Sequence, residues 1–148
     1  MKWVIDASVA AKWLAPEPGS AQADRLLDDE LQVPSLLFPE VAKVLWQKQA
    51  SGEMDIATVL IAARWLLQLP LQVHECALLL KDGLDLAVRL RHPADDCFYL
   101  ALARRVDCPL VTADRRLIDR CRRPDAQDLA TRIVFLQDLG EVPGGNAF

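Results

Sequence analysis

Four carboxylates stand at positions from which they could bind a divalent metal ion. Asp6 and Asp114 each follow a short apolar segment that is predicted to form a strand, and Glu40 and Asp96 lie near the starts of two predicted helices. Carboxylates that converge without matching cations repel one another, so such a cluster persists mainly when a divalent cation neutralises it. The types and positions of these residues therefore predict a metal site, provided that the fold brings them together.

Each carboxylate also has a purely structural explanation. Asp6 and Asp114 could cap the helices that follow them, Asp96 could interact with a helix dipole from the first turn, and Glu40 could be an ordinary glutamate at a helix start. Two features favour a shared site. Asp6 and Asp114 both end apolar strands, which parallel pairing would bring side by side, and Asp96 lies in the helix just before the second strand.

An all-oxygen ligand set suits Mg²⁺, with Mn²⁺ as a substitute. We expect no zinc site, because no histidine or cysteine is placed to complete one. The four cysteines are scattered without a CxxC pair, which is typical of buried thiols in a reducing compartment. A magnesium site of this kind positions phosphate oxygens and activates a water.

Length and composition predict one globular domain. The chain has 148 residues, of which 52% are hydrophobic, and can bury a substantial core. It has no long apolar run and no charged-then-apolar leader, so we expect a cytoplasmic protein without a membrane segment. The formal net charge is −4, so any binding of nucleic acid must come from a local basic patch or from bound metal.

The apolar pattern predicts the elements that position these side chains. Strands are predicted at residues 2–5, 31–33, 110–111 and 133–136, with a further short extended piece at 71–73. Helices are predicted at residues 7–14, 35–49, 55–69, 75–91 and about 95–106, with shorter helices after Ser20, as an N-cap, and after Asp114. A polar loop is expected at residues 122–128.

This alternation predicts an α/β fold with a short parallel sheet and helices on both faces. The order of the strands cannot be read from the pattern. We expect a single domain at residues 1–139 and a loose C-terminal tail at residues 140–148, where three of the six glycines lie.

Basic residues close to the predicted site could contact phosphate. Arg115 and Arg116 open an arginine-rich stretch that ends at Arg123, and this stretch is either a solvated helix face or part of a path for nucleic acid. Lys12 and Lys43 lie on helices that begin with a proposed ligand, so each is a further candidate for a phosphate contact.

Four segments of the chain resemble the motif blocks of PIN-domain ribonucleases, and most closely those of the VapC-type toxins of bacterial toxin–antitoxin pairs. The segments are Val-Ile-Asp-Ala-Ser-Val at 4–9, Pro-Glu-Val-Ala at 39–42, Asp-Cys-Phe-Tyr-Leu-Ala-Leu-Ala at 96–103 and Thr-Ala-Asp-Arg-Arg-Leu at 112–117. The resemblance extends from residue 2 to about residue 139. The four segments together are specific, whereas Thr-Ala-Asp alone is a weak signal.

The resemblance implies an endoribonuclease that depends on Mg²⁺ and hydrolyses RNA phosphodiesters through a metal-activated water. Asp6, Glu40, Asp96 and Asp114 would hold one or two metal ions. Two hydroxyl residues, Ser8 and Thr112, would lie beside these acids and orient them. The resemblance further implies a homodimer and a small VapB-like antitoxin that covers the groove.

One position departs from the family pattern. Asp95 stands where the family usually has a tyrosine, so either Asp95 or Asp96 could be the third acid. The spacing to Tyr99 matches Asp96, which we assign to the site. Adjacent helical residues point about 100° apart, so we expect only one of the two to face the metal.

Two other functions remain as alternatives. A phosphatase with Asp6 as nucleophile would need a second aspartate two residues later, but Ser8 occupies that position. A non-catalytic interaction module could keep the same fold, although the presence of all four acids argues against it.

Overall fold

The structure is a computed structural model, and it describes residues 1–140. Its centre is a five-stranded sheet in which all neighbouring strands are parallel. The strands are β1 (Lys2–Ile5), β2 (Glu30–Pro34), β3 (Gln72–His74), β4 (Leu110–Thr112) and β5 (Ile133–Phe135), in the spatial order β3-β2-β1-β4-β5. The predicted strands are confirmed, and the order of the sheet is new information.

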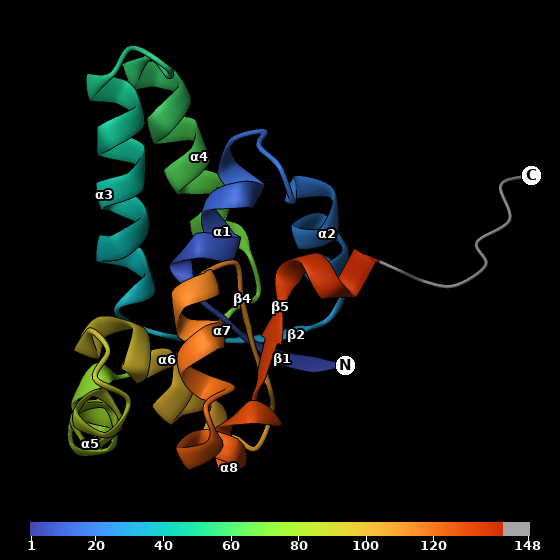
Figure 1. The fold of residues 1–148 in the computed structure, drawn as a ribbon. Helices are drawn as coiled ribbons and strands as arrows, with labels where there is room; N and C mark the ends of the chain where they lie inside the picture. Colours follow the sequence, from blue (N-terminus) through green and yellow to red (C-terminus); the bar gives the residue numbers. More distant parts are fainter. Residues whose placement is uncertain (141–148) are drawn as a thin grey trace, which may run out of the picture.

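Helices cover both faces of this sheet, as predicted (Figure 1). The first four are α1 (Ala7–Leu14), α2 (Ser20–Arg25), α3 (Leu37–Ala50) and α4 (Ile56–Gln68). The last four are α5 (Leu80–Leu90), α6 (Ala94–Arg105), α7 (Arg115–Cys121) and α8 (Gln127–Ala130). Right-handed crossovers place the two sets on opposite faces, because the chain crosses the sheet in opposite directions before and after β3.

The direction in which the chain adds strands to the sheet reverses between β1 and β4. From β1 the chain moves outward through β2 to β3, then returns to the other side of β1 to form β4 and β5. The register pairs Ile5 with Val111, so the carboxyl ends of β1 and β4 lie side by side. In open α/β sheets this switch point is where ligands bind. Asp6 follows β1 directly, and Asp114 lies two residues after β4.

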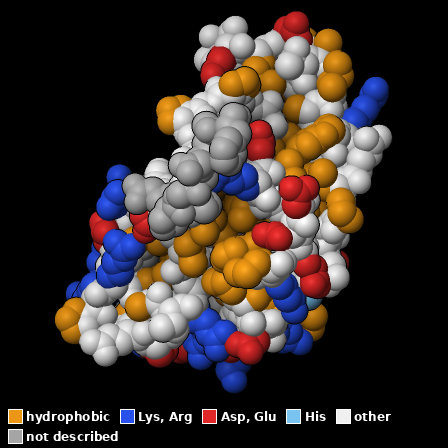
Figure 2. Space-filling model, turned by 90° about the vertical axis from the view of Figure 1, so that its right-hand side faces the viewer, with side chains coloured by type: hydrophobic (Ala, Val, Ile, Leu, Met, Phe, Trp, Pro, Cys, Tyr) orange, Lys and Arg blue, Asp and Glu red, His pale blue; other side chains and the backbone are white. Residues whose placement is uncertain are grey.

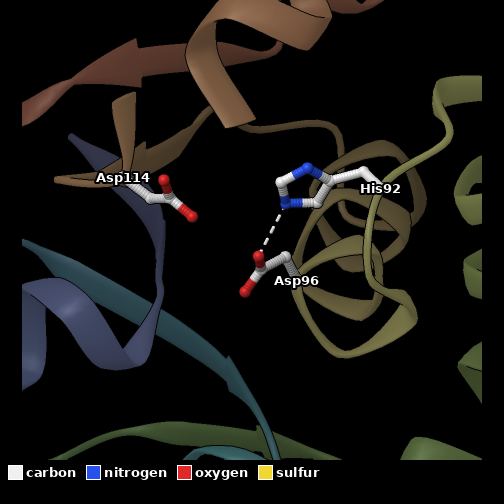
Figure 3. A group of neighbouring side chains, drawn as sticks. All are labelled: His92, Asp96 and Asp114. Carbon is white, nitrogen blue, oxygen red and sulfur yellow. Dashed lines mark hydrogen bonds and ion pairs between the residues drawn. The ribbon is translucent and has the colours of Figure 1, made fainter. Parts of the chain in front are cut away.

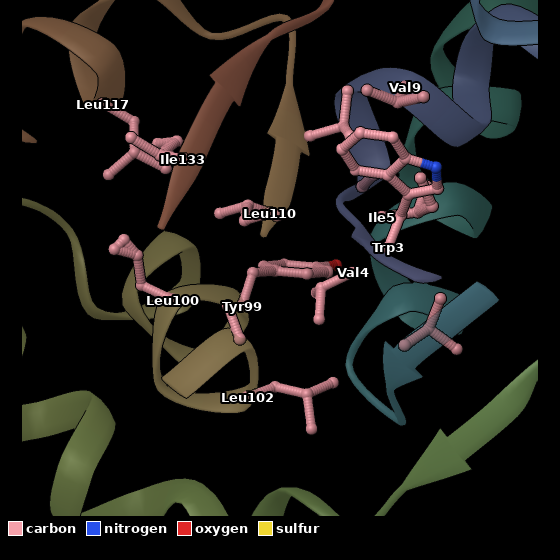
Figure 4. Packing of buried hydrophobic residues seen from close by; sticks show 14 of the residues in the cluster. Trp3, Val4, Ile5, Val9, Tyr99, Leu100, Leu102, Leu110, Leu117 and Ile133 are labelled. Carbon is pink, nitrogen blue, oxygen red and sulfur yellow. The ribbon is translucent and has the colours of Figure 1, made fainter. Parts of the chain in front are cut away.

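The core lies between the sheet and the helices on its two faces (Figure 4). Val4 and Ile5 of β1 are fully buried, because the central strand is covered on both sides. Tyr99 and Leu102 of α6 are equally inaccessible and pack in the same cluster. Helix α6 crosses the centre of the sheet, where it contacts β1, β2 and β4. This packing fixes the side of α6 that carries the central acidic residues.

Three local predictions need correction. The segment 75–91 is not one helix, because a 3₁₀ turn, η2 (Cys76–Leu79), precedes α5. The segment 122–128, predicted as a polar loop, contains a second 3₁₀ turn, η3 (Pro124–Ala126), and the start of α8. Burial of Leu129 holds α8 against the core. Ser20 is not the N-cap of α2: Gly19 takes that position with φ +95°, and the Ser20 hydroxyl donates to the backbone carbonyl of Lys12 instead.

Gly83 lies inside α5, where glycine costs helix stability. A Cβ at this position would come within 3.4 Å of the Phe98 ring on α6, so the glycine allows these two helices to approach closely. Two further short 3₁₀ elements are η1 (Leu26–Asp28) after α2 and η4 (Leu136–Gly140) after β5. In residues 1–140, no helix is both long and apolar enough to cross a membrane. The predicted loose tail lies almost wholly outside the described residues.

Candidate metal and nucleic-acid site

Asp6 is held rigidly at the carboxyl end of β1. It is the N-cap of α1, where its Oδ1 accepts a hydrogen bond from the backbone N–H of Val9 at 3.2 Å. The Ser8 hydroxyl donates to the same oxygen, and the Thr112 hydroxyl donates to Oδ2. Asp6 is 5% exposed, so it combines the capping role with a fixed place at the switch point.

Two hydroxyls join the loop after β1 to the loop after β4. Ser8 Oγ accepts from the backbone N–H of Ala113, and Thr112 Oγ1 accepts from that of Asp114, both at 3.0 Å. Both hydroxyls donate to Asp6, but Ser8 accepts from the loop after β4, whereas Thr112 accepts from its own loop and reaches across to Asp6. This pair of hydrogen bonds positions Asp6 relative to Asp114, which is itself the N-cap of α7 through the N–H of Arg116 at 2.9 Å.

Glu40 enters the site from the first turn of α3, where Pro39 also lies without breaking the helix. The Tyr99 hydroxyl donates to Glu40 Oε1 at 2.8 Å. Tyr99 is 1% exposed, so its ring is part of the core while its hydroxyl reaches the site. Sequence reasoning used Tyr99 only as a spacing marker and missed this contact.

Asp96 and Asp95 both face the site, contrary to the expectation that only one would. Both side chains line the same cavity, and one carboxylate oxygen each of Glu40, Asp95 and Asp96 lie within 4.8 Å of one another. Asp95 and Asp96 lie in the first turn of α6. Because the N-terminal end of this helix faces the cavity, two neighbouring side chains can both line it. Asp95 is exposed, whereas Asp96 is half-buried.

His92 lies beside the predicted metal site, although the sequence placed no histidine or cysteine there to complete a zinc site. Its Nε2 lies 2.7 Å from Asp96 Oδ2, and one ligand atom each of His92, Asp96 and Asp114 lie within 4.8 Å of one another (Figure 3). The turn between α5 and α6 folds the imidazole back over the start of α6, because Arg91 adopts a left-handed conformation with φ 52°. The available signal was a histidine four residues before an aspartate at a helix start.

A cavity of about 580 Å³ lies at the switch point, and the acidic side chains described above line it. It is lined by all four acids predicted from the sequence and by Asp95, Ser8 and Tyr99, with Lys12, Glu17, Lys43 and Lys48 among the residues at its sides. Within the described part of the chain, Asp6 belongs to neither of the two ligand groups above. The four acids thus share one cavity without forming a single tight cluster.

Burial shifts the protonation of these acids. Burial raises the pKa of Asp6 to about 6, although the hydrogen bonds from Ser8 and Thr112 oppose the shift. Burial also raises the pKa of Glu40 to about 7 against the Tyr99 hydrogen bond, with a further increase from nearby Asp95 and Asp96. The pKa of Asp96 is raised mainly by burial, and the hydrogen bond with His92 opposes this shift.

These shifts and the ligand atoms fit a divalent cation. Carboxylates that ionise reluctantly next to one another become stable when a cation replaces their protons. The oxygen donors suit Mg²⁺, with Mn²⁺ as a substitute, and His92 Nε2 is hydrogen-bonded to Asp96 Oδ2, so its role is to orient that carboxylate. Among the described residues, two groups of three have ligand atoms within 4.8 Å of one another: Glu40 with Asp95 and Asp96, and His92 with Asp96 and Asp114.

Of the four basic residues predicted to contact phosphate, Lys12 and Lys43 line the acidic cavity, Arg116 lines a neighbouring cavity and Arg115 lines neither. Lys43 is exposed at the cavity, whereas Lys12 is bound to Glu17 Oε1 at 3.0 Å and to a backbone carbonyl. Arg116 points to a neighbouring cavity that borders Asp96 and Asp114. Arg115 instead stacks over the Phe135 ring, with 4.6 Å between its Cζ and the ring centroid, so it is not at either cavity.

Known proteins share both this sequence and this fold. The family profile described as "PIN domain" matches residues 3–123. Ribonuclease VapC3 from Pyrobaculum aerophilum is 36% identical over 124 residues, which span 81% of this chain and 95% of that protein.

Two solved structures have a similar fold. The crystal structure of PAE2754 from Pyrobaculum aerophilum has a TM-score of 0.66 and 21% identity, covering 94% of this chain and 86% of that one. The crystal structure of VapBC2 from Rickettsia felis, bound to a DNA fragment from their promoter, has a TM-score of 0.61 and 12% identity, covering 91% and 98%. The family match, the VapC relative and the acidic cavity at the switch point agree, and the chain belongs to the PIN-domain family as a VapC-type member.

Proposed function

We propose that this protein is a Mg²⁺-dependent endoribonuclease and the toxin of a type II toxin–antitoxin pair. The observation that carries the proposal is the position of Asp96. It shares one ligand group with Glu40 and another with His92 and Asp114, at the switch point of a parallel sheet. The similarity to Ribonuclease VapC3 supports RNA as the substrate.

A bound Mg²⁺ or Mn²⁺ ion would supply Lewis-acid chemistry, drawing in the phosphodiester and activating a water for attack at phosphorus. The protein groups prepare the site for this. His92 holds Asp96 through Oδ2 and the Tyr99 hydroxyl holds Glu40 through Oε1, so each acid that lines the cavity has one oxygen fixed. Lys43, exposed at the cavity, offsets the negative charge that would otherwise repel RNA.

The alternative of an aspartate-nucleophile phosphatase has little support at Asp6. Both of its carboxylate oxygens already accept hydrogen bonds from hydroxyl groups, and the residue is buried. A nucleophile needs an oxygen that is free to approach phosphorus. Asp6 is better suited to hold a cation or to fix the neighbouring ligands.

Two apolar surfaces suit the two proposed partners, a VapB-like antitoxin and a second copy of this chain. Ile61 and Trp65 of α4 are exposed and line an apolar cavity with Trp13 of α1. On the face shown in Figure 2, exposed apolar side chains run from the upper right to the centre, and Lys and Arg side chains lie at the left and at the lower end. We assign the antitoxin to the cavity between α1 and α4, because α1 also lines the acidic cavity that it would cover, as does α3, which packs against α4.

The homodimer is assigned to α5. Leu80, Leu84 and Val88 are all more than half exposed and recur every four residues, so they form one apolar stripe. Val88→Glu should convert a dimer to a monomer in light scattering, and Ile61→Glu should instead weaken binding of the antitoxin.

All four cysteines are free, which suits a reducing cytoplasm where RNA is available.

The proposal is tested by incubating the purified protein with single-stranded RNA. Cleavage that needs Mg²⁺ or Mn²⁺ and leaves 5′-phosphate ends is expected, together with slow growth on expression and relief by the antitoxin. Cleavage at full rate by protein shown to be free of metal would contradict the metal-dependent mechanism. Intact RNA and normal growth with abundant folded protein would favour the interaction module.

A further inference from the structure

A second cavity lies on the other side of Asp96 and Asp114. It has a volume of about 460 Å³, and its other charged side chains are Arg91, Arg116, Arg120, His92 and Asp119. The two aspartates therefore form the wall between this cavity and the acidic cavity. A ligand that occupies both would have one part beside the ligand groups and the next part among three arginines.

The three arginines have no ion-pair partner within residues 1–140. Other arginines of the same region are paired: Arg122 lies 3.6 Å from Asp138, and Arg123 lies 3.5 Å from Asp125. Asp119 is the only acid of the second cavity, among the described residues, that is not part of the wall. The cavity thus holds three guanidinium groups beside three carboxylates, and none of these guanidinium groups is in ion-pair contact with an acid of the described residues.

Two features beside the cavity concern Arg91 and His92. Arg91 ends α5 in the left-handed region, with φ 52°, a conformation that favours glycine over arginine. His92 donates to Asp96 Oδ2 and so occupies the oxygen that an arginine could otherwise take. Asp96 is therefore bound by His92, and Arg91, Arg116 and Arg120 have no ion pair with it in the described residues.

We propose that this second cavity binds a backbone phosphate of single-stranded RNA that neighbours the phosphate to be cleaved. Guanidinium groups bind phosphate oxygens through paired N–H donors, which makes them suited to an RNA backbone in any sequence. The inference rests on the proposed function, because it assumes that RNA occupies the acidic cavity. It assigns roles to Arg91, Arg116 and Arg120 and none to Arg115.

The test measures binding of a fluorescent single-stranded RNA by anisotropy in Mg²⁺ at several potassium concentrations. A Glu40→Gln background prevents cleavage, and Glu40 does not line the second cavity. Arg116→Gln and Arg120→Gln are compared with Arg122→Gln and Arg123→Gln, which remove the same charge from the same region outside the cavity. Circular dichroism verifies equal folding of all variants.

The cavity variants should each weaken binding by about tenfold at low salt and reduce the slope of log K against log salt by about 0.7. The control variants should keep the slope of the parent. Equal slopes for cavity and control variants, with a parent that binds RNA, would overturn the subsite and leave the proposed function intact. A wild-type protein that neither binds nor cleaves RNA would overturn both.

A second measurement locates the phosphate. An RNA with one uncharged methylphosphonate linkage next to the mapped cleavage site should raise the KM of the wild-type enzyme. The same linkage should have little further effect on Arg120→Gln, because the contact is already lost. Equal penalties for wild type and variant at every neighbouring linkage would contradict the assignment.

Discussion

Asp96 and Asp95 are neighbours whose roles differ in the structure. Asp96 takes part in both ligand groups and is held by His92, whereas Asp95 is exposed and takes part in one. The family pattern pointed to Asp96, and its additional contacts agree with that choice. The presence of Asp95 in the same cavity means that its charge also contributes.

We predict that Asp96→Asn lowers the cleavage rate by more than about 100-fold and that Asp95→Asn lowers it by less than about tenfold. The reason is that Asp96 offers an ordered oxygen to both groups, while Asp95 can be replaced by solvent. Initial rates in saturating Mg²⁺, at equal folded fraction by circular dichroism, measure the difference. The opposite ranking would assign the ligand to Asp95.

His92 is expected to act on the metal site by holding Asp96. His92→Ala should weaken Mn²⁺ binding by about 10- to 100-fold, because Asp96 loses the hydrogen bond that orients it. His92→Gln, which keeps a donor, should recover part of the affinity in calorimetric titration. His74→Ala is the matched control, since His74 contacts Gln32 at 2.6 Å and lines neither cavity. Equal affinities for His92→Ala and the control would leave His92 without this role.

At the scale of elements, the site depends on the pairing of β1 with β4. The Thr112 hydroxyl donates to Asp6 at the end of β1 and accepts from the N–H of Asp114. Thr112 is fully buried, so no solvent can replace these hydrogen bonds. The same side chain therefore stabilises the strand pair and sets the distance between two acids.

Thr112→Val should reduce the free energy of unfolding by about 1 to 3 kcal/mol, because the shape is kept while Asp6 and the N–H of Asp114 lose a partner. The cleavage rate should fall as well. Urea denaturation of wild type and variant measures the first effect. Thr131→Val is the control, because Thr131 is exposed at the end of α8 and should change stability by less than about 0.5 kcal/mol. A neutral Thr112→Val variant would show that the hydroxyl bridge does not position the loops.

At the scale of the whole molecule, the acidic cavity makes the metal-free fold sensitive to pH. Asp6 and Glu40 have pKa values raised from 3.8 to about 6 and from 4.5 to about 7. The native state therefore binds more protons than the unfolded state between pH 4 and 7, so stability falls as pH rises through this window. For Asp6 alone the shift corresponds to about 3 kcal/mol.

We predict that the metal-free protein loses about 2 to 4 kcal/mol of stability between pH 5 and pH 8. Mg²⁺ should restore stability at pH 8 more than at pH 5, because it binds the ionised carboxylates of the native state. Urea denaturation in EDTA and in Mg²⁺ at both pH values measures this. Glu40→Gln should reduce the pH dependence, whereas the exposed Glu53→Gln should keep it. A metal-free protein that is equally stable at both pH values would mean that burial does not raise the pKa values of Asp6 and Glu40 in the native state.

The sequence by itself determined the elements and the chemistry of the site. Apolar runs at residues 2–5 and 110–111 predicted two buried strands, and the acids after them predicted a metal site. These signals are local, since they depend on which side chains are buried within one segment. The helix boundaries shifted where tertiary contacts overrode local preference, as at the 3₁₀ turn before α5 and at the buried Leu129 of α8.

The tertiary structure decided which side chains meet. The order of the sheet places β4 beside β1, and only this arrangement brings Thr112 to Asp6 and the two loops to one cavity. The contact of Tyr99 with Glu40 joins residues 59 positions apart, so no local pattern could reveal it. The arginines after Asp114 look alike in the sequence, but the direction of each side chain from α7 places Arg116 at a cavity and Arg115 on an aromatic ring. Long-range packing sets these directions, because a helix can present any of its faces to its neighbours until the core fixes one of them.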